Sequence, residues 1–401
     1  MIEMNKRLDI YLLIYLLTLL IFSYFFLFIK HNVGNDSTIS EWLINYEGGF
    51  TKRGLIGQIA IELSRYFQTN LRWMIFLLQS FTLTLYFILL FNLLKHLHYE
   101  RIIILSIFTP IFILYPVAEI EVLARKEVIV FTLFLTYLFI PRNSNYKIFS
   151  FTIFLVLAIL IWEPIVFFFP LIFLFEIIEN KIENIDKKLI KLILSFLPSF
   201  LIALLIIFDP ITPEQHKIMA LTLKNEFGES CYMSCGRLIT VSSIAQQFQG
   251  QIERYSLEVF VRYSLIIFIG FFPLFILFRN SKLNNKKLFL FKNFNNPINT
   301  FYLGVLPVSV LFAMGFDWGR WVNIFYVILA LIYFQLLIKE HLTLNLETLR
   351  QNFLYKIKGK AFVILFILFC FGWNPKTVIT GDVASFPGYR IPYKVFKTLS
   401  N

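Results

Sequence analysis

Long apolar runs separated by short polar segments recur along the whole chain. A helix needs about 20 mainly apolar residues to cross a ~30 Å hydrocarbon core, and the runs lack the strict alternation of outer-membrane β-strands. The pattern therefore predicts an all-α, polytopic helical membrane protein with about 11 transmembrane helices. We expect these helices at residues 8–29, 72–94, 101–115, 128–141, 148–161, 165–178, 189–208, 257–278, 299–315, 322–338 and 361–373.

Three predicted spans are short. Runs 128–141, 148–161 and 165–178 each hold about 14 residues, fewer than the ~20 that a crossing needs. Either their ends extend through charged residues, or the connecting loops dip below the membrane surface. Irregular backbone is tolerated at that depth only against protein or a water-filled cavity. We expect a cavity that opens outward and is lined by the loops.

Residues 54–67 predict an amphipathic helix that lies in the membrane interface rather than crossing it. Its apolar and polar positions fall on opposite helical faces: Leu55, Ile56, Ile59, Leu63 and Phe67 against Gln58, Glu62 and Arg65. The glycines of the preceding segment would give the chain a flexible entry to this helix.

Basic residues favour an orientation with the N-terminus in the cytoplasm, because short basic loops stay on that side. The predicted inside segments are 142–147, 181–191, 279–292 and 339–360. The run 8–29 exceeds a typical signal-peptide core and no small-residue cleavage site follows it, so we expect an uncleaved first span.

The predicted organisation is one integral membrane domain, residues 1–401, with three outer segments. These are the first outer loop (30–71), a large outer loop (209–256) that could form a cap, and an outer C-terminal tail (374–401).

Composition agrees with this class. The chain is 58% hydrophobic and only 15% charged, whereas soluble domains contain about 25% charged residues. The predicted location is a bacterial inner membrane, with the C-terminus on the outer side.

The first outer loop gathers charge around glycines. Lys52 and Arg53 begin the amphipathic helix, where free N–H groups and the helix dipole attract anions. We interpret them as a phosphate or pyrophosphate clamp, the alternative being contact with lipid headgroups. Glu47 precedes them as a candidate catalytic acid.

The segment Glu119–Glu127 lies between two short predicted spans, so its charges fall at membrane depth. Glu121 and Arg125 have the i, i+4 spacing of a helical ion pair. Ionisable groups at that depth usually mark a site or pathway, which makes Arg125, Lys126 and Glu127 candidate site residues.

Glu163, in Trp162-Glu163-Pro164, has no cation near it in sequence. We therefore expect burial to raise its pKa, as suits a proton acceptor. In Asp317–Trp321, Asp317 and Arg320 either pair with each other or serve a site. There Arg320 would bind an anion and Trp318 and Trp321 would stack on sugar rings, the alternative being interfacial anchoring.

Cys231 and Cys235 lie in the large outer loop and are compatible with a disulfide or with free thiols. Without a further cysteine or a histidine nearby in sequence they make a poor metal site, so no metal is expected. Nucleotide-binding glycine motifs are missing from the sequence. A donor used on the outer face would then have to be linked to lipid, and neither a cofactor nor a nucleic-acid partner is expected.

With its many spans and the motifs Gly49–Gly57, Arg125–Glu127 and Asp317–Trp321, the chain resembles O-antigen and capsule polymerases of bacterial polysaccharide clusters. More broadly it resembles membrane glycosyltransferases of the C-type fold. The resemblance implies polymerisation of lipid-pyrophosphate-linked repeat units, with polyprenyl-pyrophosphate glycans and membrane lipids as ligands. A chain-length regulator and a flippase are its implied partners.

The resemblance assigns candidate roles. Lys52, Arg53, Arg125, Lys126 and Arg320 would bind the pyrophosphate, and Glu47, Glu127, Asp317 or Glu163 would accept a proton. The alternatives are a C-type transferase that uses a polyprenyl-phosphate sugar and a lipid-linked glycan flippase or exporter. The predicted spans carry few ionisable residues on their inner halves, which favours an enzyme over a transporter.

Overall fold

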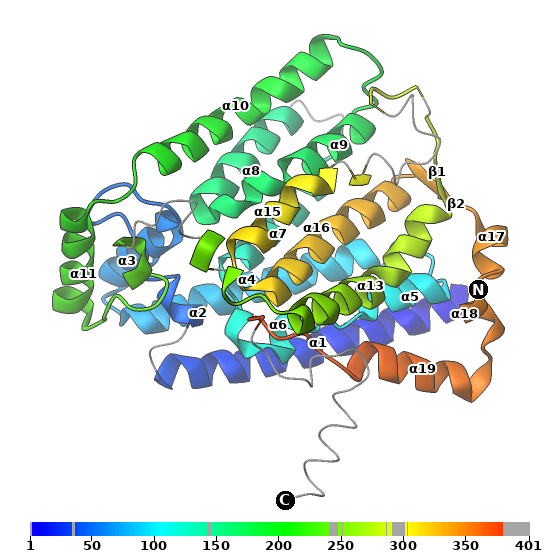
Figure 1. The fold of residues 1–401 in the computed structure, drawn as a ribbon, viewed down its shortest axis with the longest axis horizontal. Helices are drawn as coiled ribbons and strands as arrows, with labels where there is room; N and C mark the ends of the chain where they lie inside the picture. The colour runs from blue at the N-terminus through cyan, green and yellow to red at the C-terminus, as the bar shows by residue number, and fades with distance from the viewer. Residues whose placement is uncertain are drawn as a thin grey trace, which may run out of the picture.

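The computed structural model describes residues 2–33, 37–142, 146–239, 248–250, 252–285, 287–290, 301–302 and 304–379. Its architecture is a bundle of helices with one small sheet, in which strands β1 (Ser281–Leu283) and β2 (Leu342–Leu344) pair antiparallel (Figure 1). The all-α class that the sequence predicts is therefore confirmed.

Five of the helices are long and apolar enough to cross a membrane. They are α1 (Ile2–Val33), α4 (Leu71–Leu94), α10 (Lys187–Phe208), α13 (Leu257–Arg279) and α16 (Trp318–Ile338). The first and third of these hydrophobic helices expose much of their apolar surface, as expected for helices that face lipid.

The remaining segments are shorter than a membrane crossing. They are α2 (Ser37–Ser40), α3 (Gly54–Phe67), α5 (Arg101–Phe108), α6 (Tyr115–Ala118), η1 (Ile120–Val122), α7 (Lys126–Phe139), α8 (Lys147–Ile161), η2 (Glu163–Phe168), α9 (Phe169–Glu179), α11 (Pro213–Phe227), η3 (Gly236–Ile239), η4 (Leu306–Val308), α15 (Ser309–Met314), α17 (Leu346–Arg350), α18 (Phe353–Lys356) and α19 (Gly359–Phe371).

Two predicted spans are not continuous helices. The span predicted at 101–115 ends at Phe108, and turns that lead into α6 follow it. Asn323 of α16 donates hydrogen bonds to the carbonyls of Ile111 and Phe112, so protein satisfies this irregular backbone. The span predicted at 299–315 contains the short α15, and its residues 299, 300 and 303 lie outside the described residues.

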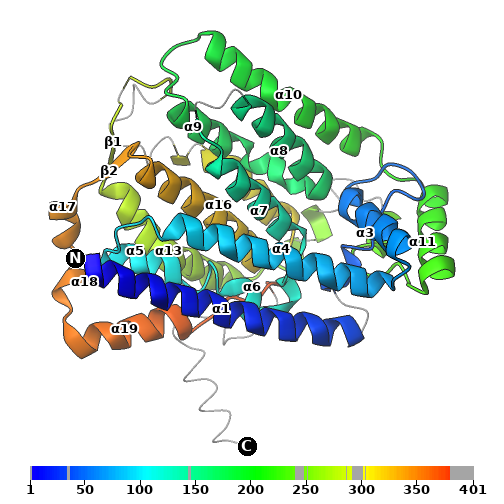
Figure 2. The same cartoon turned by 180° about the vertical axis from the view of Figure 1, so that it is seen from behind.

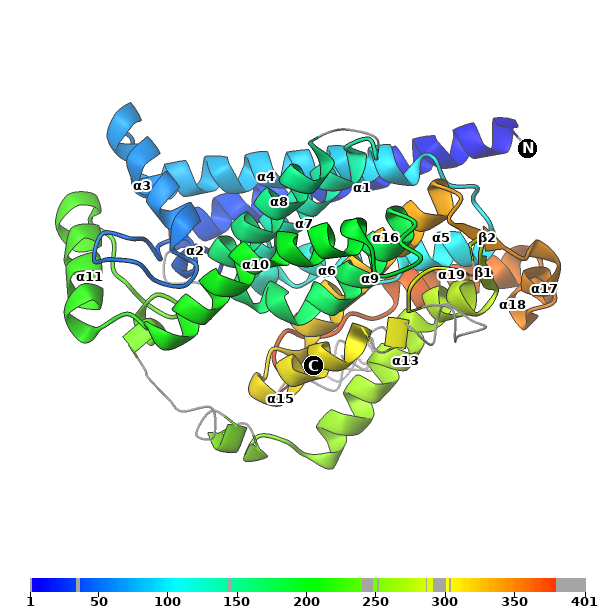
Figure 3. The same ribbon diagram turned by 90° about the horizontal axis from the view of Figure 1, so that it is seen from above.

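Helix α16 forms the centre of the bundle. It is largely buried and packs against α4, α7, α9 and α13 (Figure 3). Because its apolar side chains contact neighbours on all sides, the polar residues of its first turn are held in fixed positions.

The polar segments gather at two opposite ends of the bundle. Helices α3 and α11 lie at one end, whereas α17, α18, the two strands and the N-terminus lie at the other (Figures 1 and 2). Parts of the first and the large predicted outer loops thus meet at the same end.

These two outer loops share a small apolar core, which we call the cap core. It is formed by Ile39, Trp42, Leu43, Ile44, Ala60, Ile61, Leu71, Ile75, Ile211, Met219, Leu223, Cys235 and Leu238. Helix α11 begins with a capping box in which Thr212 and Gln215 bond each other's backbone N–H groups. The described part of the large loop is therefore a folded unit; its residues 240–247 and 251 lie outside the described residues, as do 380–401 of the predicted tail.

Candidate functional site

A cavity of about 380 Å³ lies at the end of the bundle beside the cap core. Segments far apart in the sequence line it: Ser37, Ile44, Lys52, Arg53, Glu121, Arg125, Met233, Ser234, Arg237, Leu238, Met314, Gly315, Phe316, Asp317, Arg320, Trp321, Thr377 and Val378. The structure thus brings four of the predicted pyrophosphate-binding cations to the wall of one cavity: Lys52, Arg53, Arg125 and Arg320.

Glu41 is the centre of the ion-pair network behind this cavity. Its side chain is fully buried, and its Oε1 accepts hydrogen bonds from Arg125 and from Arg320 Nη2, the latter at 3.2 Å. Arg53 Nη1 lies 3.6 Å from the same oxygen. Burial alone would raise the pKa of Glu41, but the three guanidinium groups outweigh it and hold the pKa well below its usual range. Glu41 is therefore an ionised anchor for three arginines.

Arg320 is also held by Glu127. Its Nε and Nη2 donate to the two carboxylate oxygens of Glu127 at 2.5 and 2.8 Å. Both side chains are buried, and Glu127 lies in the first turn of α7, where the helix dipole favours an anion. Glu127 does not line the cavity, so its place fits a residue that orients Arg320 rather than the predicted proton acceptor.

The expectation for Glu163 is wrong. Arg53 Nε and Nη2 donate to its two carboxylate oxygens at 2.6 and 2.7 Å. Burial acts to raise the pKa of Glu163, but the Arg53 charge outweighs it and the pKa lies below its ordinary value. The sequence could not reveal this because the two residues are 110 positions apart.

Lys126 lies fully buried behind Arg53. Its Nζ donates a hydrogen bond to the Arg53 carbonyl, and Arg53 has a left-handed backbone with φ 61°. Burial lowers the pKa of Lys126 to about 7. Lys126 does not line the cavity, so it supports the backbone of the clamp instead of contacting a ligand.

The predicted helical pair of Glu121 and Arg125 is not formed. The segment η1 ends at Val122, and Ala124 has a left-handed φ of 51°, which breaks the i, i+4 geometry. The indole N–H of Trp42 holds the Ala124 carbonyl at 3.0 Å. This turn directs Arg125 to Glu41 and places it on the cavity wall.

Two buried donors on the cavity wall have no hydrogen-bond partner among the described residues. They are Trp321 Nε1 and Arg125 Nε, whose side chains belong to residues only 8% and 6% exposed. A buried donor left unpaired is costly. Both donors are therefore suited to an acceptor-rich ligand such as phosphate.

The two tryptophans differ. Trp321 lines the cavity, whereas Trp318 is buried among Tyr255, Tyr263 and Phe312, with its indole N–H donating to the Phe312 carbonyl at 2.7 Å. The predicted sugar-stacking role of Trp318 does not fit this position.

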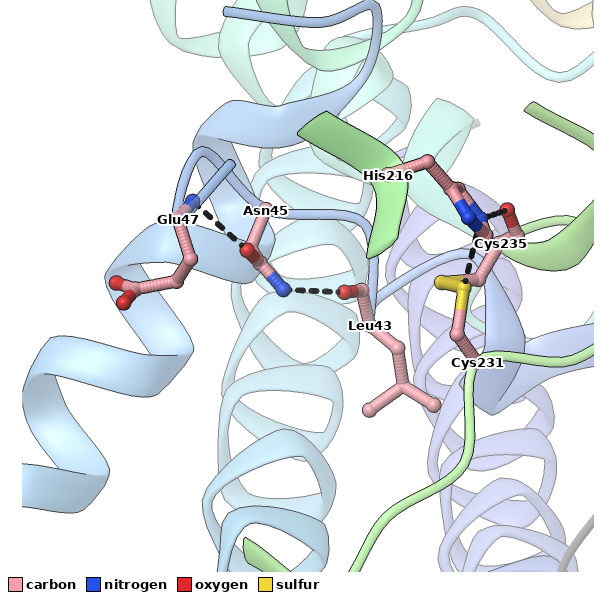
Figure 4. Close-up of a disulfide and its surroundings, with 6 residues drawn as sticks. All are labelled: Leu43, Asn45, Glu47, His216, Cys231 and Cys235. Carbon is pink, nitrogen blue, oxygen red and sulfur yellow. Dashed lines mark hydrogen bonds between the residues drawn. A yellow bond between two sulfur atoms is a disulfide. The ribbon is translucent and has the colours of Figure 1, made fainter. Parts of the chain in front are cut away.

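Glu47 lies apart from the cavity. Its carboxylate accepts two hydrogen bonds from Arg65, each at 2.9 Å, and these bonds lower the pKa of Glu47. Figure 4 shows its side chain directed away from the disulfide that borders the cavity. We therefore remove Glu47 from the candidate site. Asp317 does line the cavity, with Oδ2 3.5 Å from Arg320 Nη1.

A disulfide joins Cys231 and Cys235, which settles the alternative that the sequence left open. His216 of α11 lies beside it, with Nε2 3.3 Å from Cys231 Sγ and 3.1 Å from the Cys235 carbonyl (Figure 4). The sequence gives no sign of this contact, because His216 lies 15 positions before Cys231. Sulfurs bonded to each other offer no thiolate to a metal, so the group serves to hold the 231–238 segment against the cavity.

Comparisons of the chain with protein-family models, with curated proteins and with solved structures find no match.

Proposed function

We propose that the protein is a membrane glycosyltransferase that polymerises lipid-pyrophosphate-linked oligosaccharide repeat units on the outer face of a bacterial inner membrane. The observation that carries the proposal is the cavity wall formed by Lys52, Arg53, Arg125 and Arg320. Two buried donors of this wall, Arg125 Nε and Trp321 Nε1, have no hydrogen-bond partner among the described residues. Its volume of about 380 Å³ lies in the range of small-ligand sites.

The arrangement of the cations on the cavity wall favours an anionic ligand. In the buried network, three carboxylates (Glu41, Glu127 and Glu163) pair with three arginines (Arg53, Arg125 and Arg320). On the cavity wall itself, the charges of Lys52 and Arg237 are matched in number by those of Glu121 and Asp317, so an anion would be bound by the directed donors of the arginines rather than by an excess of positive charge. Preorganised cations of this kind stabilise charge that develops on a leaving pyrophosphate.

The position of Asp317 suits the general base. Among the described residues that line the cavity, the carboxylates belong to Asp317 and Glu121, and Asp317 is the nearer of the two to the clamp through Arg320. In the proposed step the acceptor hydroxyl oxygen bonds to the anomeric carbon and gives its proton to Asp317. The bond from that carbon to the pyrophosphate oxygen breaks, and its electron pair leaves with the pyrophosphate.

A transporter would need a polar path to the opposite end of the bundle. That end has its own buried charges, where Lys339 and His341 lie 3.4 and 3.2 Å from Glu179. Between the two ends, α16 carries no acidic or basic side chain from Val322 to Ile338. The lack of charge along this central helix favours an enzyme over a flippase or exporter.

The test is deletion of the gene in its source bacterium, followed by complementation and analysis of surface polysaccharide as a ladder on a gel. Loss of the ladder with a single repeat unit retained is the result expected for a polymerase. Arg320→Ala and Arg53→Ala should each fail to restore the ladder, because each removes a cavity-wall cation. Each also leaves a carboxylate without its arginine, the buried Glu127 in the first variant and the partly buried Glu163 in the second.

Arg350→Ala is the matched control, since Arg350 pairs with Glu100 at the opposite end of the bundle. It should restore the full ladder. A normal ladder from both cavity variants at wild-type protein levels would refute the clamp. Loss of every surface unit in the deletion strain would favour the flippase instead.

A further inference from the structure

An apolar groove of about 290 Å³ runs between α13, α16 and the side chains of Phe301, Tyr302 and Val305. Its walls are mainly aromatic, with Phe271 and Phe275 from one helix and Phe325 from another. The rings of Phe271 and Phe325 pack against each other at a tilt, with centroids 4.8 Å apart, so part of the groove wall is formed by packed rings.

The groove lies next to the cavity along α16. Trp321 lines the cavity, Phe325 lines the groove one helical turn later, and Leu329 continues the groove wall after a further turn. Residues at i and i+4 share a helix face and are separated by about 6 Å along the axis. The groove therefore begins about one turn deeper in the bundle than the cavity.

The groove is open on the side that a membrane would cover. Phe268 and Phe275 are 68% and 42% exposed, although they lie within a helix apolar enough to cross a membrane. In Figure 3, α13 and α15 project from one side of the bundle. A chain that enters here from the hydrocarbon core would pack against these rings without crossing a polar layer.

We propose that the groove holds the polyprenyl chain of the substrate whose pyrophosphate lies in the cavity, an inference that rests on the proposed function. The groove follows the cavity along α16, so an apolar chain attached to an anion beside Trp321 would enter the groove at Phe325. This continuity identifies the chain as the occupant. The arrangement makes the site selective for an anionic head joined to one long apolar chain.

The experiment measures binding of three probes to the full chain in phospholipid nanodiscs: inorganic pyrophosphate, geranyl pyrophosphate and a long-chain polyprenyl pyrophosphate. Val305→Trp fills the groove from its side wall. It should weaken binding of the long-chain probe by roughly tenfold or more and leave binding of inorganic pyrophosphate unchanged. Ile267→Trp, on the opposite wall, should reproduce this result.

Leu201→Trp is the matched control, since Leu201 is 51% exposed on α10, outside the groove. It should bind all three probes as the wild type does. Thermal unfolding of each variant identifies those that fold, and only these are compared.

The proposal is overturned if the wild type binds the long-chain probe no tighter than geranyl pyrophosphate, or if both folded groove variants keep full affinity for it. Phospholipid occupying the groove equally well would give the first of these results. Failure of the wild type to bind inorganic pyrophosphate would instead refute the anion clamp, so the two proposals fail in different ways.

Discussion

At the scale of single residues, the site contains buried charges whose desolvation would be too costly without an ion-pair partner. Glu41 and Arg320 are almost fully buried, and each contacts more than one opposite charge. Removing one partner of a buried pair typically costs about 3–5 kcal/mol because the other charge stays unpaired. The ion pairs therefore hold the arginine side chains in fixed directions, whereas their net contribution to the free energy of unfolding is small.

Lys126 gives the first prediction at this scale. Its pKa is lowered by burial from 10.5 to about 7, so between these values the unfolded chain binds a proton that the folded chain does not. Stability should therefore rise as the pH increases from 7 to 9, by at most about 1.4 kcal/mol per pH unit from this group. Lys126→Met should remove that part of the slope.

The measurement is the unfolding temperature of detergent-solubilised protein at several pH values between 6 and 9. The wild type and the variant share all other titrating groups, so the difference between their curves isolates Lys126. Parallel curves across this range would show that Lys126 does not titrate there.

At the scale of elements, helix α3 has one face that packs against protein and one apolar face that is exposed. The predicted bounds 54–67 are confirmed. Its small residues Gly54, Gly57 and Ala60 are buried against protein, whereas apolar side chains such as Ile59 and Phe67 are 40% and 59% exposed. The exposed face agrees with the predicted position in the membrane interface. The face with the small residues lets α3 pack closely on the first outer loop, where Gly57 lies against the Ile44 carbonyl.

Gly57 gives the second prediction. An added Cβ would lie 1.9 Å from the Ile44 carbonyl oxygen, a backbone atom that cannot move aside cheaply. Alanine is intrinsically better than glycine in a helix by about 1 kcal/mol, but the clash outweighs this gain. Gly57→Ala should lower the unfolding temperature and weaken binding of inorganic pyrophosphate.

Gly250→Ala is the control, because Gly250 is helical and a Cβ there would meet nothing within 4 Å. It should not lower the unfolding temperature, because alanine favours a helix where it meets no clash, and it should leave binding of inorganic pyrophosphate unchanged. Equal stability and binding of Gly57→Ala and the wild type would mean that α3 does not pack closely on the first loop.

At the scale of the whole molecule, the polar segments divide between the two ends of an apolar bundle. The end with α3 and α11 contains the cavity, and the end with α17 and α18 contains the N-terminus (Figure 1). A membrane around the five long helices would place these ends on opposite sides.

Topology gives the third prediction. Lys224→Cys on α11 and Glu347→Cys on α17 place single thiols at exposed positions of the two ends. In spheroplasts, a membrane-impermeant thiol reagent should label Lys224→Cys directly and Glu347→Cys only after permeabilisation, as the distribution of basic residues implies. The unmodified chain is the background control, since Cys370 is buried. The opposite labelling pattern would invert the predicted orientation.

The all-α class, most helix positions and the motifs that carry charge can be read from the amino-acid sequence. Apolar length and periodicity are local properties, so runs such as 72–94 and 54–67 could be read directly as helices close to α4 and α3. The sequence also located the cations of the site, because isolated charges between apolar runs are conspicuous.

The partners of these charges, in contrast, depend on how the chain packs in three dimensions. Glu163 meets Arg53 across 110 positions and Arg320 meets Glu127 across 193, distances over which sequence carries no pairing signal. For the same reason the sequence does not single out Glu41 as the anchor of the arginines. Nor does it show that Arg65 holds the Glu47 carboxylate apart from the cavity. The long α16 could be predicted from its own residues, but its role as the buried centre depends on the helices packed around it.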